Sequence, residues 1–318
     1  MLYWYTTGME ITLFRSANNA LDAASARPPR EIKPAMTPLA PVQALWIGPR
    51  LSLMERLSIA SFLAHGHPVH LYLYDACENV PPGTTLCDAA AILPRDRVFT
   101  YRAGFGAGVP AGFANVFRYA LLNQMGGWWV DLDVVAVQPF AFDAPMVIGA
   151  VNTGGRVSIG AGVIWSGAGT PFILECVRRS TLVDPKTMRW GETGPRLVRE
   201  VVDTLGLQSN VVPPEVFYPV HSDDVLQLVR PGHLALGERT VAVHLWAQLW
   251  RHFGLDPNGR YPADSPYEQF IRQYLPGEAH LPRRRVSVTG QWIRTLPTRV
   301  WHWSTMQIQR QRRRRQQR

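Results

Sequence analysis

The chain has 318 residues and is 46% hydrophobic, so it can bury the core of one large domain or two modest ones. Its formal net charge is +9, but eleven of its 33 basic residues are arginines from Arg283 onward, where no acidic residue occurs. The preceding residues carry 22 basic against 24 acidic side chains, so the basic character belongs to a tail and not to the body.

Cysteine content and hydropathy favour a cytoplasmic protein. The three cysteines form no closely spaced metal-binding pair, and such a sparse, odd set suits a reducing compartment. No apolar run reaches the roughly eighteen residues of a membrane-spanning helix. The opening MLYWYTTGMEITLF lacks a basic leader ahead of a hydrophobic core, which makes it a poor signal peptide.

The composition divides the chain into three parts. Residues 1–40 are rich in Ala, Pro, Ser and Thr without periodicity and predict a disordered leader. Residues 41–282 carry the apolar patterns of a single folded domain. Residues 283–318 form a basic tail that contains three tryptophans.

The first elements of the domain predict a βαβ unit. QALWIG, ending at Gly48, is typical of a strand. Ser52 and Glu55 give the S-x-x-E pattern of a capping box, so we expect a helix from there to about His65. HPVHLYLYD alternates apolar and polar residues and predicts a second strand. This order indicates an α/β fold with a mostly parallel sheet flanked by helices.

The stretch NVFRYALLNQMGGWWVDLDVVAVQPF, which begins at Asn115, holds the residues most indicative of chemistry. Its first part has helical periodicity and carries Arg118, and two glycines then end the helix. WWVDLD is expected to be a strand, in which Asp131 and Asp133 share one face. The acids would then lie at the carboxyl edge of the sheet, where open α/β folds bind their ligands.

Two carboxylates one residue apart in an apolar run are costly to bury unless a cation meets them. They repel each other, and burial favours their protonation unless a positive charge intervenes. Mg²⁺ and Mn²⁺ prefer oxygen ligands and keep positions open for phosphate oxygens. Arg118 can pair with the same acids or bind a phosphate with both of its terminal nitrogens. These residue types suit a substrate with a diphosphate leaving group.

Other interpretations of the acidic pair remain open. D-x-D alone is common and often marks a solvated turn. Asp131-Leu132-Asp133-Val134-Val135 also fits the nucleophile strand of haloacid-dehalogenase-like phosphatases, which need a later lysine and a further acidic pair. Lys186 and Asp223-Asp224 follow in a permissible order. A non-catalytic protein that binds nucleotide sugars or RNA is a further alternative.

The stretch FANVFRYALLNQMGGWWVDLD resembles the signature of the DXD-containing sugar transferases. This group includes initiating α-mannosyltransferases, α-1,4-galactosyltransferases, capsular polysaccharide transferases and glucosylating bacterial toxins. ALWIG, HGHPVHLYLYD, GETGPRLV, VPPEVFYPV and VAVHLWAQLW are similar to further segments of the family in the same order. The resemblance implies a GT-A fold, a UDP-sugar or GDP-sugar donor, a Mn²⁺ or Mg²⁺ cofactor and retention of anomeric configuration.

The resemblance also implies roles for individual residues. Trp46 matches the aromatic residue that stacks on the donor base, although eleven tryptophans cannot all be functional. Arg118 matches the arginine that contacts the donor, and Asp131 with Asp133 matches the metal-binding pair. Asn115 stands where many relatives have Asp. The predicted catalytic set is Asp131, Asp133 and Arg118, and the predicted donor-binding set is Trp46, Asn115, Arg118, Gly127 and Asp131.

His244 completes the predicted metal site of Asp131, Asp133 and His244. It lies in the apolar segment VAVHLW, where a lone histidine is either a core residue or a ligand. Glu192, Thr193 and Gly194 are candidates for shaping the acceptor side.

The arginines and tryptophans of the tail suit docking on an anionic membrane surface, with RNA binding and a solvated tail as alternatives. Together these features predict a metal-dependent, retaining glycosyltransferase in polysaccharide biosynthesis. Its expected acceptor is a glycan or a lipid-linked sugar, and its expected place is the cytoplasm or the inner face of the cell membrane.

Overall fold

The computed structural model describes residues 39–153 and 156–286. The predicted leader therefore lies almost entirely outside the described residues, as does most of the predicted tail. The strands are β1 Val42–Trp46, β2 Val69–Leu73, β3 Thr84–Asp88, β4 Gly127–Val130, β5 Val134–Ala136, β6 Met146–Thr153, β7 Arg156–Ser166, β8 Val211–Val212 and β9 Ala242–His244. The helices are α1 Leu53–Ala64, α2 Ala111–Met125, α3 Pro171–Thr181, α4 Leu197–Leu205, α5 Pro214–Phe217, α6 Ala247–Phe253, α7 Pro266–Tyr274 and α8 Pro276–Ala279.

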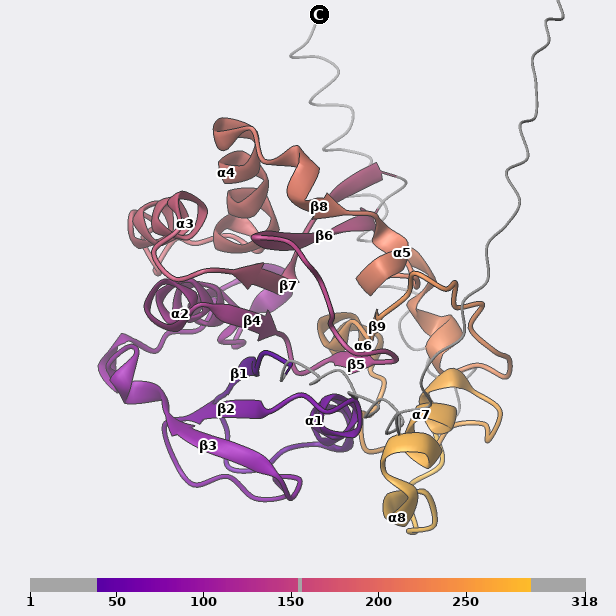
Figure 1. The fold of residues 1–318 in the computed structure, drawn as a ribbon. Coiled ribbons are helices and arrows are strands. Elements are labelled where there is room, and N and C mark those ends of the chain that lie inside the picture. The colour runs from indigo at the N-terminus through magenta and orange to yellow at the C-terminus, as the bar shows by residue number, and fades with distance from the viewer. Residues whose placement is uncertain (1–38, 154–155, 287–318) are drawn as a thin grey trace, which may run out of the picture. The chain divides into compact units, whose positions relative to one another are not determined.

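A seven-stranded sheet in the order β3-β2-β1-β4-β7-β6-β8 forms the centre of the fold (Figure 1). β7 runs antiparallel to both of its neighbours, while every other adjacent pair is parallel. A second, two-stranded sheet pairs β5 with β9. The fold is thus of the expected α/β class, with a mostly parallel sheet flanked by helices. Because β7 reverses direction, β4 and β6 point the same way and end at the same edge of the sheet.

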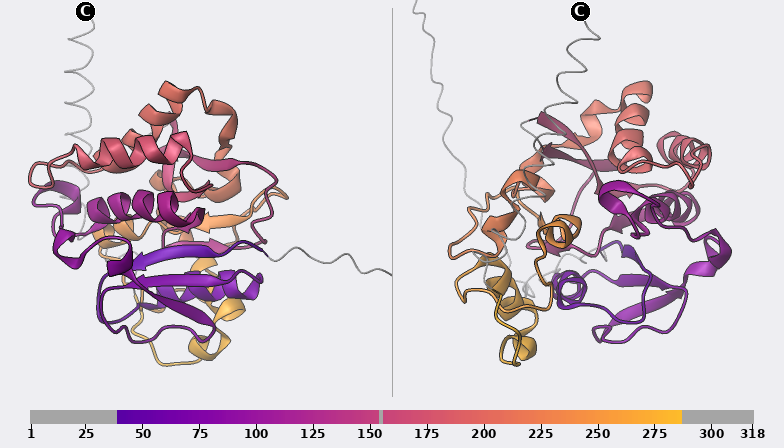
Figure 2. Two further views of the ribbon diagram at one scale, coloured as in Figure 1. Left: turned by 60° about the vertical axis from the view of Figure 1, so that its left-hand side comes forward. Right: turned by 180° about the vertical axis from the view of Figure 1, so that it is seen from behind.

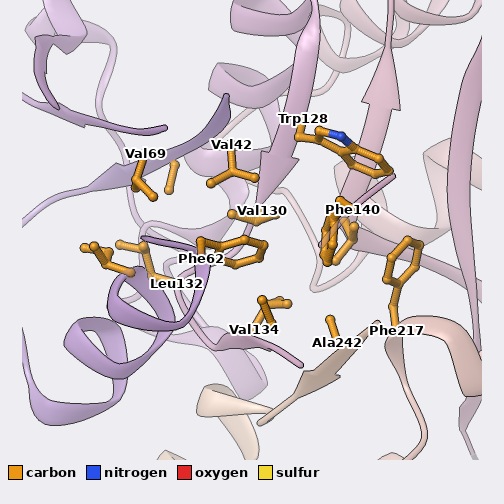
Figure 3. Packing of buried hydrophobic residues seen from close by; sticks show 14 of the residues in the cluster. Val42, Phe62, Val69, Trp128, Val130, Leu132, Val134, Phe140, Phe217 and Ala242 are labelled. Carbon is orange, nitrogen blue, oxygen red and sulfur yellow. The ribbon is translucent and has the colours of Figure 1, made fainter. Parts of the chain in front are cut away.

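Helices cover both faces of the large sheet (Figures 1 and 2). On one face α2, α3 and α4 pack against a buried cluster that includes Trp129 and Ile148. On the other face α1, α5 and the small sheet enclose a cluster that includes Trp128 and Val130. Figure 3 shows Val130, Leu132 and Val134 in this second cluster, so the chain that carries the two acids is anchored by apolar neighbours on either side of each acid.

The predicted capping box and βαβ unit are confirmed. The Ser52 side chain accepts from the backbone of the first helical turn, and the Glu55 side chain accepts from Ser52 N (2.7 Å). Two buried serines of α1 then hold β5: Ser58 Oγ donates to Val134 O (2.6 Å), and Ala136 N donates to Ser61 Oγ (2.9 Å). α1 therefore positions the strand that directly follows Asp133.

A buried histidine ties the entry of the domain to the segment after β5. His67 Nδ1 lies 2.9 Å from Ala40 O, and Phe140 N donates to His67 Nε2 (2.9 Å). The neutral ring with its proton on Nδ1 satisfies both partners. Burial lowers the pKa of His67, which favours the same neutral form.

The packed body continues past the predicted boundary at residue 282. The Arg283 side chain is 8% exposed, and its Nη2 pairs with Glu268 Oε2 at 2.5 Å. Arg260 N donates to Arg284 O, and Val286 N donates to Arg260 O. The sequence gives no sign of these contacts, because an arginine run does not show that one of its members has a buried partner.

Among the described residues, no helix is both long enough and apolar enough to cross a membrane.

Candidate metal centre

The chain turns directly after β4, which corrects the prediction of a strand through Asp133. β4 ends at Val130, and Val134 N donates to Asp131 O (3.2 Å), closing a turn over the acidic pair. Asp131 N still bonds to Gly162 O of β7 (2.8 Å). The turn allows β5 to leave the large sheet and pair with β9. The two carboxylates nevertheless converge, now because of the turn and not because of strand alternation.

Asp131 is held on one side by Arg118 and Trp129. Its Oδ1 accepts from Arg118 Nη2 (2.6 Å) and from Trp129 Nε1 (2.8 Å). The guanidinium also lies over the Trp129 ring, 4.9 Å from the centroid, and donates to Ala161 O. Burial raises the pKa of Asp131, Arg118 opposes that rise and Asp133 adds to it. These contacts use Oδ1 and leave Oδ2 facing the space beside Gly162.

Pairing of β5 with β9 brings His244 to the acidic turn, although it lies 111 residues after Asp133 in the chain. Val134 is opposite His244 in this pairing. One residue further along, Leu245 N donates to Asp133 O (2.7 Å). The small sheet in Figure 1 is therefore the element that assembles the predicted trio.

One oxygen of the Asp133 carboxylate accepts a hydrogen bond, and the other has no hydrogen-bond partner among the described residues. Its Oδ2 accepts from Ala247 N (2.8 Å), the first residue of α6. Its Oδ1 is buried without a hydrogen-bond partner in the described structure and lies 3.3 Å from His244 Nε2. His244 Nδ1 accepts from Trp246 N (3.1 Å), so the proton of the neutral ring sits on Nε2. A metal ion bound at Nε2 would displace that proton.

These residues fit a divalent cation. One ligand atom from each of Asp131, Asp133 and His244 can be chosen so that all three lie within 4.8 Å of one another. Gly162 leaves the intervening space open, since a Cβ there would lie 3.0 Å from Asp131 Oδ2 and 3.1 Å from His244 Nε2. Two carboxylate oxygens and one imidazole suit Mn²⁺, and the oxygens suit Mg²⁺. Asp133 Oδ1, which is buried without a hydrogen-bond partner in the described residues, is the atom that most favours a role as a cation ligand, because buried polar atoms normally have partners.

Asn115 lies on α2, one turn before Arg118, and meets the predicted T-G-P segment. Asn115 Nδ2 donates to Thr193 Oγ1 (3.3 Å). A Cβ on Gly194 would lie 2.9 Å from the same nitrogen, so only glycine allows this close packing. The helical segment Glu192–Arg196 is thus brought against the helix that carries Arg118.

Trp46 and Gly127 fall at opposite ends of the sheet. Gln43 of β1 pairs with Trp129, so Trp46, three residues later, is level with the acidic turn. Gly127 lies four residues before Asp131, about 13 Å away at the strand rise of 3.3 Å per residue. It packs against Gln43, whose Nε2 would be 3.0 Å from a Cβ. Gly127 therefore starts β4 and lies outside the acidic cluster, and its role in donor binding stays a prediction.

Tyr218 is a site residue that the sequence did not single out. Its ring lies 5.1 Å from that of His244, and its hydroxyl is buried without a hydrogen-bond partner in the described chain. Burial raises the pKa of Tyr218, and the nearby Asp131 raises it further, so the hydroxyl keeps its proton. A Cβ on Gly160 would lie 2.6 Å from that oxygen. An aromatic residue in VFYPV looks like any core position, so only the tertiary structure identifies it.

The residues that the phosphatase alternative requires lie elsewhere. Lys186 is exposed in a loop, and Asp223 and Asp224 are exposed on the helical turn Ser222–Leu228. Within the described residues, Asp131 pairs with Arg118, and Asp133 lies beside His244. The candidate metal cluster consists of Asp131, Asp133 and His244. Lys186, Asp223 and Asp224 belong to neither set.

Comparison with known proteins finds similarity at the level of structure alone. No family model and no curated protein matches this sequence. Similar solved structures include the PaToxG glycosyltransferase, 14% identical over 54% of this chain and 73% of that chain, with a TM-score of 0.37. The apo structure of the bifunctional glycosyltransferase WbbM is 12% identical over 79% of this chain and 51% of that chain, with a TM-score of 0.41. These likenesses are weak, and the site is the stronger indication of function.

Proposed function

We propose that this protein is a metal-dependent glycosyltransferase that moves a sugar from a UDP-sugar or GDP-sugar to a glycan or lipid-linked acceptor. The observation that carries the proposal is the cluster of Asp131, Asp133 and His244 beside buried Arg118, at the carboxyl edge of an α/β sheet. We further propose that residues 39–286 form the transferase domain. The family resemblance of the sequence adds retention of anomeric configuration to the proposal.

The charge of the site supports a diphosphate-bearing substrate. Asp131 Oδ2, Asp133 Oδ1 and His244 Nε2 would hold the cation, which when bound supplies Lewis-acid stabilisation to the leaving diphosphate. Arg118 balances the charge of Asp131 and fixes its orientation through a fork that lysine cannot reproduce. Because the Arg118 side chain is fully buried against protein atoms, we assign it to positioning Asp131 rather than to direct contact with the donor.

Two further side chains suit the ends of the donor. Trp46 is level with the acidic turn, and its indole nitrogen is buried without a partner in the described structure, beside Gly48. We propose that this ring stacks on the nucleotide base. We also propose that the uncharged amide of Asn115 hydrogen-bonds to hydroxyl groups of the donor sugar. The Tyr218 ring packs against His244 at 5.1 Å between centroids, and we propose that it positions the histidine of the metal site.

A thermal-shift screen of nucleotide sugars with and without Mn²⁺ tests the proposal. We expect a UDP-sugar or GDP-sugar to raise the melting temperature only when Mn²⁺ is present, because ligands stabilise the state that binds them. A response confined to phosphate analogues would favour a phosphatase. Stabilisation by nucleotide sugars without transfer or hydrolysis would favour a non-catalytic binding protein.

The membrane role of the tail stays a prediction, since residues 287–318 lie outside the described residues. Eight of the eleven arginines in the predicted tail fall within this range. Each can contribute about 1 kcal/mol near an anionic surface. Truncation after Val286 keeps Arg283 and its buried partner, and it should abolish co-sedimentation with anionic vesicles at low salt. Equal sedimentation of both forms would reject the membrane role, and preferential binding of the intact tail to RNA would replace it.

A further inference from the structure

A group of aromatic side chains from three parts of the chain lies beside the candidate metal centre. Tyr101 and Phe105 come from the loop between β3 and α2, and Trp190 comes just before the helical segment Glu192–Arg196. The centroid of the Trp190 ring lies 5.3 Å from that of Tyr101 and 5.2 Å from that of Phe105. His252 of α6 lies 5.3 Å from Phe105 on the same measure. These four residues form the aromatic cluster.

Trp190 presents part of its ring to solvent. It is 39% exposed, and within residues 39–153 and 156–286 it is the one Phe, Tyr or Trp in the exposed class. Tyr101 beneath it is 3% exposed. A Cβ on Gly106 would lie 2.4 Å from Trp190 Cε3 and 2.8 Å from Tyr101 Cδ2. The indole therefore rests directly on the loop backbone, which fixes the ring while leaving it accessible.

Helix α6 connects the aromatic cluster to a proposed metal ligand. Ala247 N donates to Asp133 Oδ2 (2.8 Å). The next residue, Gln248, donates from Nε2 to Phe105 O (2.7 Å). Two consecutive residues of one helix thus bond to the acid and to the loop that carries Phe105, so the aromatic cluster lies next to the metal centre.

A second connection leads to the residue proposed to bind the donor sugar. Thr193 follows Trp190 by three residues, and its Oγ1 accepts from Asn115 Nδ2 (3.3 Å). Trp190 is therefore held close to Asn115. A substrate that touches the Trp190 ring would approach the donor at its sugar end.

The residue proposed to hold the nucleotide base lies on the other face of the sheet. Trp46 packs against the buried cluster on the α1 face. Tyr101 packs against α2, where a Cβ on Gly112 would lie 3.1 Å from Tyr101 Cζ, and α2 covers the opposite face. This position favours the acceptor over the nucleotide as the partner of the aromatic cluster.

An exposed indole suits the apolar face of a sugar ring. Aromatic rings carry negative charge on their faces, which attracts the slightly positive hydrogens bound to carbon. A pyranose ring presents several such hydrogens on one face, while its hydroxyl groups remain in water. Exposed tryptophan is costly to leave without a function, because large aromatic side chains gain most from being covered.

We propose that Trp190 is a stacking surface for one pyranose ring of the acceptor glycan, with Tyr101 and Phe105 holding the indole in place. The inference rests on the proposed transferase function. It assigns the acceptor to the side of the metal centre formed by the loop before α2 and the segment that follows Trp190.

Binding of trisaccharides by the full-length protein tests the proposal without a donor. In saturation-transfer NMR with linear glucose, galactose and mannose trisaccharides, we expect at least one to bind the wild-type protein. Saturation should be strongest at the carbon-bound hydrogens on one face of a single ring. Trp190→Ala should weaken binding at least about tenfold, the scale of one lost aromatic contact. Trp190→Phe keeps an aromatic face and should bind better than Trp190→Ala.

Gly106→Ala keeps the indole but moves it, because the added methyl group would overlap Trp190, and it should also weaken binding. Leu182→Ala is the matched control, since Leu182 is 73% exposed directly after α3, and it should bind the trisaccharide like wild type. Failure of every trisaccharide to bind, or equal binding by wild type and Trp190→Ala, would overturn the stacking role. Failure of the transferase proposal would appear separately, as trisaccharide binding without any Mn²⁺-dependent thermal shift by nucleotide sugars.

Discussion

Gly162→Ala should separate metal binding from folding. Gly162 lies inside β7, and its carbonyl accepts from Asp131 N. A methyl group there would lie 3.0 Å from Asp131 Oδ2 and 3.1 Å from His244 Nε2, closer than ordinary contacts. The two side chains must then move by a few tenths of an ångström. Metal ligands tolerate deviations of only about 0.2 Å, so the methyl group disturbs the site directly.

Gly162→Ala should affect Mn²⁺ affinity and the free energy of unfolding to different extents. Changes beside metal ligands lower affinity by about 10- to 100-fold, which corresponds to roughly 1.4 to 2.7 kcal/mol. Overpacking costs about 1–3 kcal/mol of folding free energy, while replacing glycine inside a strand returns about 0.5–1 kcal/mol. We therefore expect Mn²⁺ affinity to fall by at least tenfold and the free energy of unfolding without metal to fall by at most about 2.5 kcal/mol.

Titration of Mn²⁺, followed by the electron paramagnetic resonance of the free ion, measures the affinity, and urea unfolding measures stability. Gly167→Ala is the control, because Gly167 follows the far end of β7 and a Cβ there has only one neighbour, at 3.4 Å. It should bind Mn²⁺ like wild type. Wild-type Mn²⁺ affinity in folded Gly162→Ala would refute the placement of the cation between Asp131 and His244.

Three other changes test neighbouring parts of the structure. Arg118→Lys should lower the free energy of unfolding in urea by up to about 3 kcal/mol and weaken the donor-induced thermal shift. Lysine cannot bond to both acceptors of the guanidinium, Ala161 O and Asp131 Oδ1. Wild-type values would mean that the paired contacts of the guanidinium are dispensable. Asp133→Asn should remain folded and lose at least about a hundredfold in donor turnover, and unchanged Mn²⁺-dependent turnover would remove Asp133 from the site. The free energy of unfolding should fall as the pH drops below about 6.5, because His67 takes up a proton in the unfolded state and resists it in the folded state. In urea titrations at pH 5 to 8, His67→Gln should reduce this dependence of stability on pH. An unchanged dependence would assign it to other groups.

Local patterns in the sequence determined the beginning of the fold and part of the site. The capping box at Ser52 and Glu55 and the flanking strands were predictable, because each depends on residues within a few positions of one another. The proximity of Arg118 to Asp131 was predictable for the same reason: one helix, a glycine stop and one short strand separate them. The sequence thus identified the acids and their cationic partner.

Only the tertiary structure decided how the rest of the site is built. The turn at Asp131 lets β5 leave the large sheet and pair with β9, and this pairing joins segments more than a hundred residues apart. The same pairing places His244, which lies in an apolar segment of the sequence, beside the two acids. Gly162 and Tyr218 reach the cluster because β7 runs antiparallel to β4 and because α5 packs against the sheet. Such contacts leave no local signal, since a glycine that makes room for a ligand and a tyrosine beside one have the same neighbours in sequence as residues of an ordinary core.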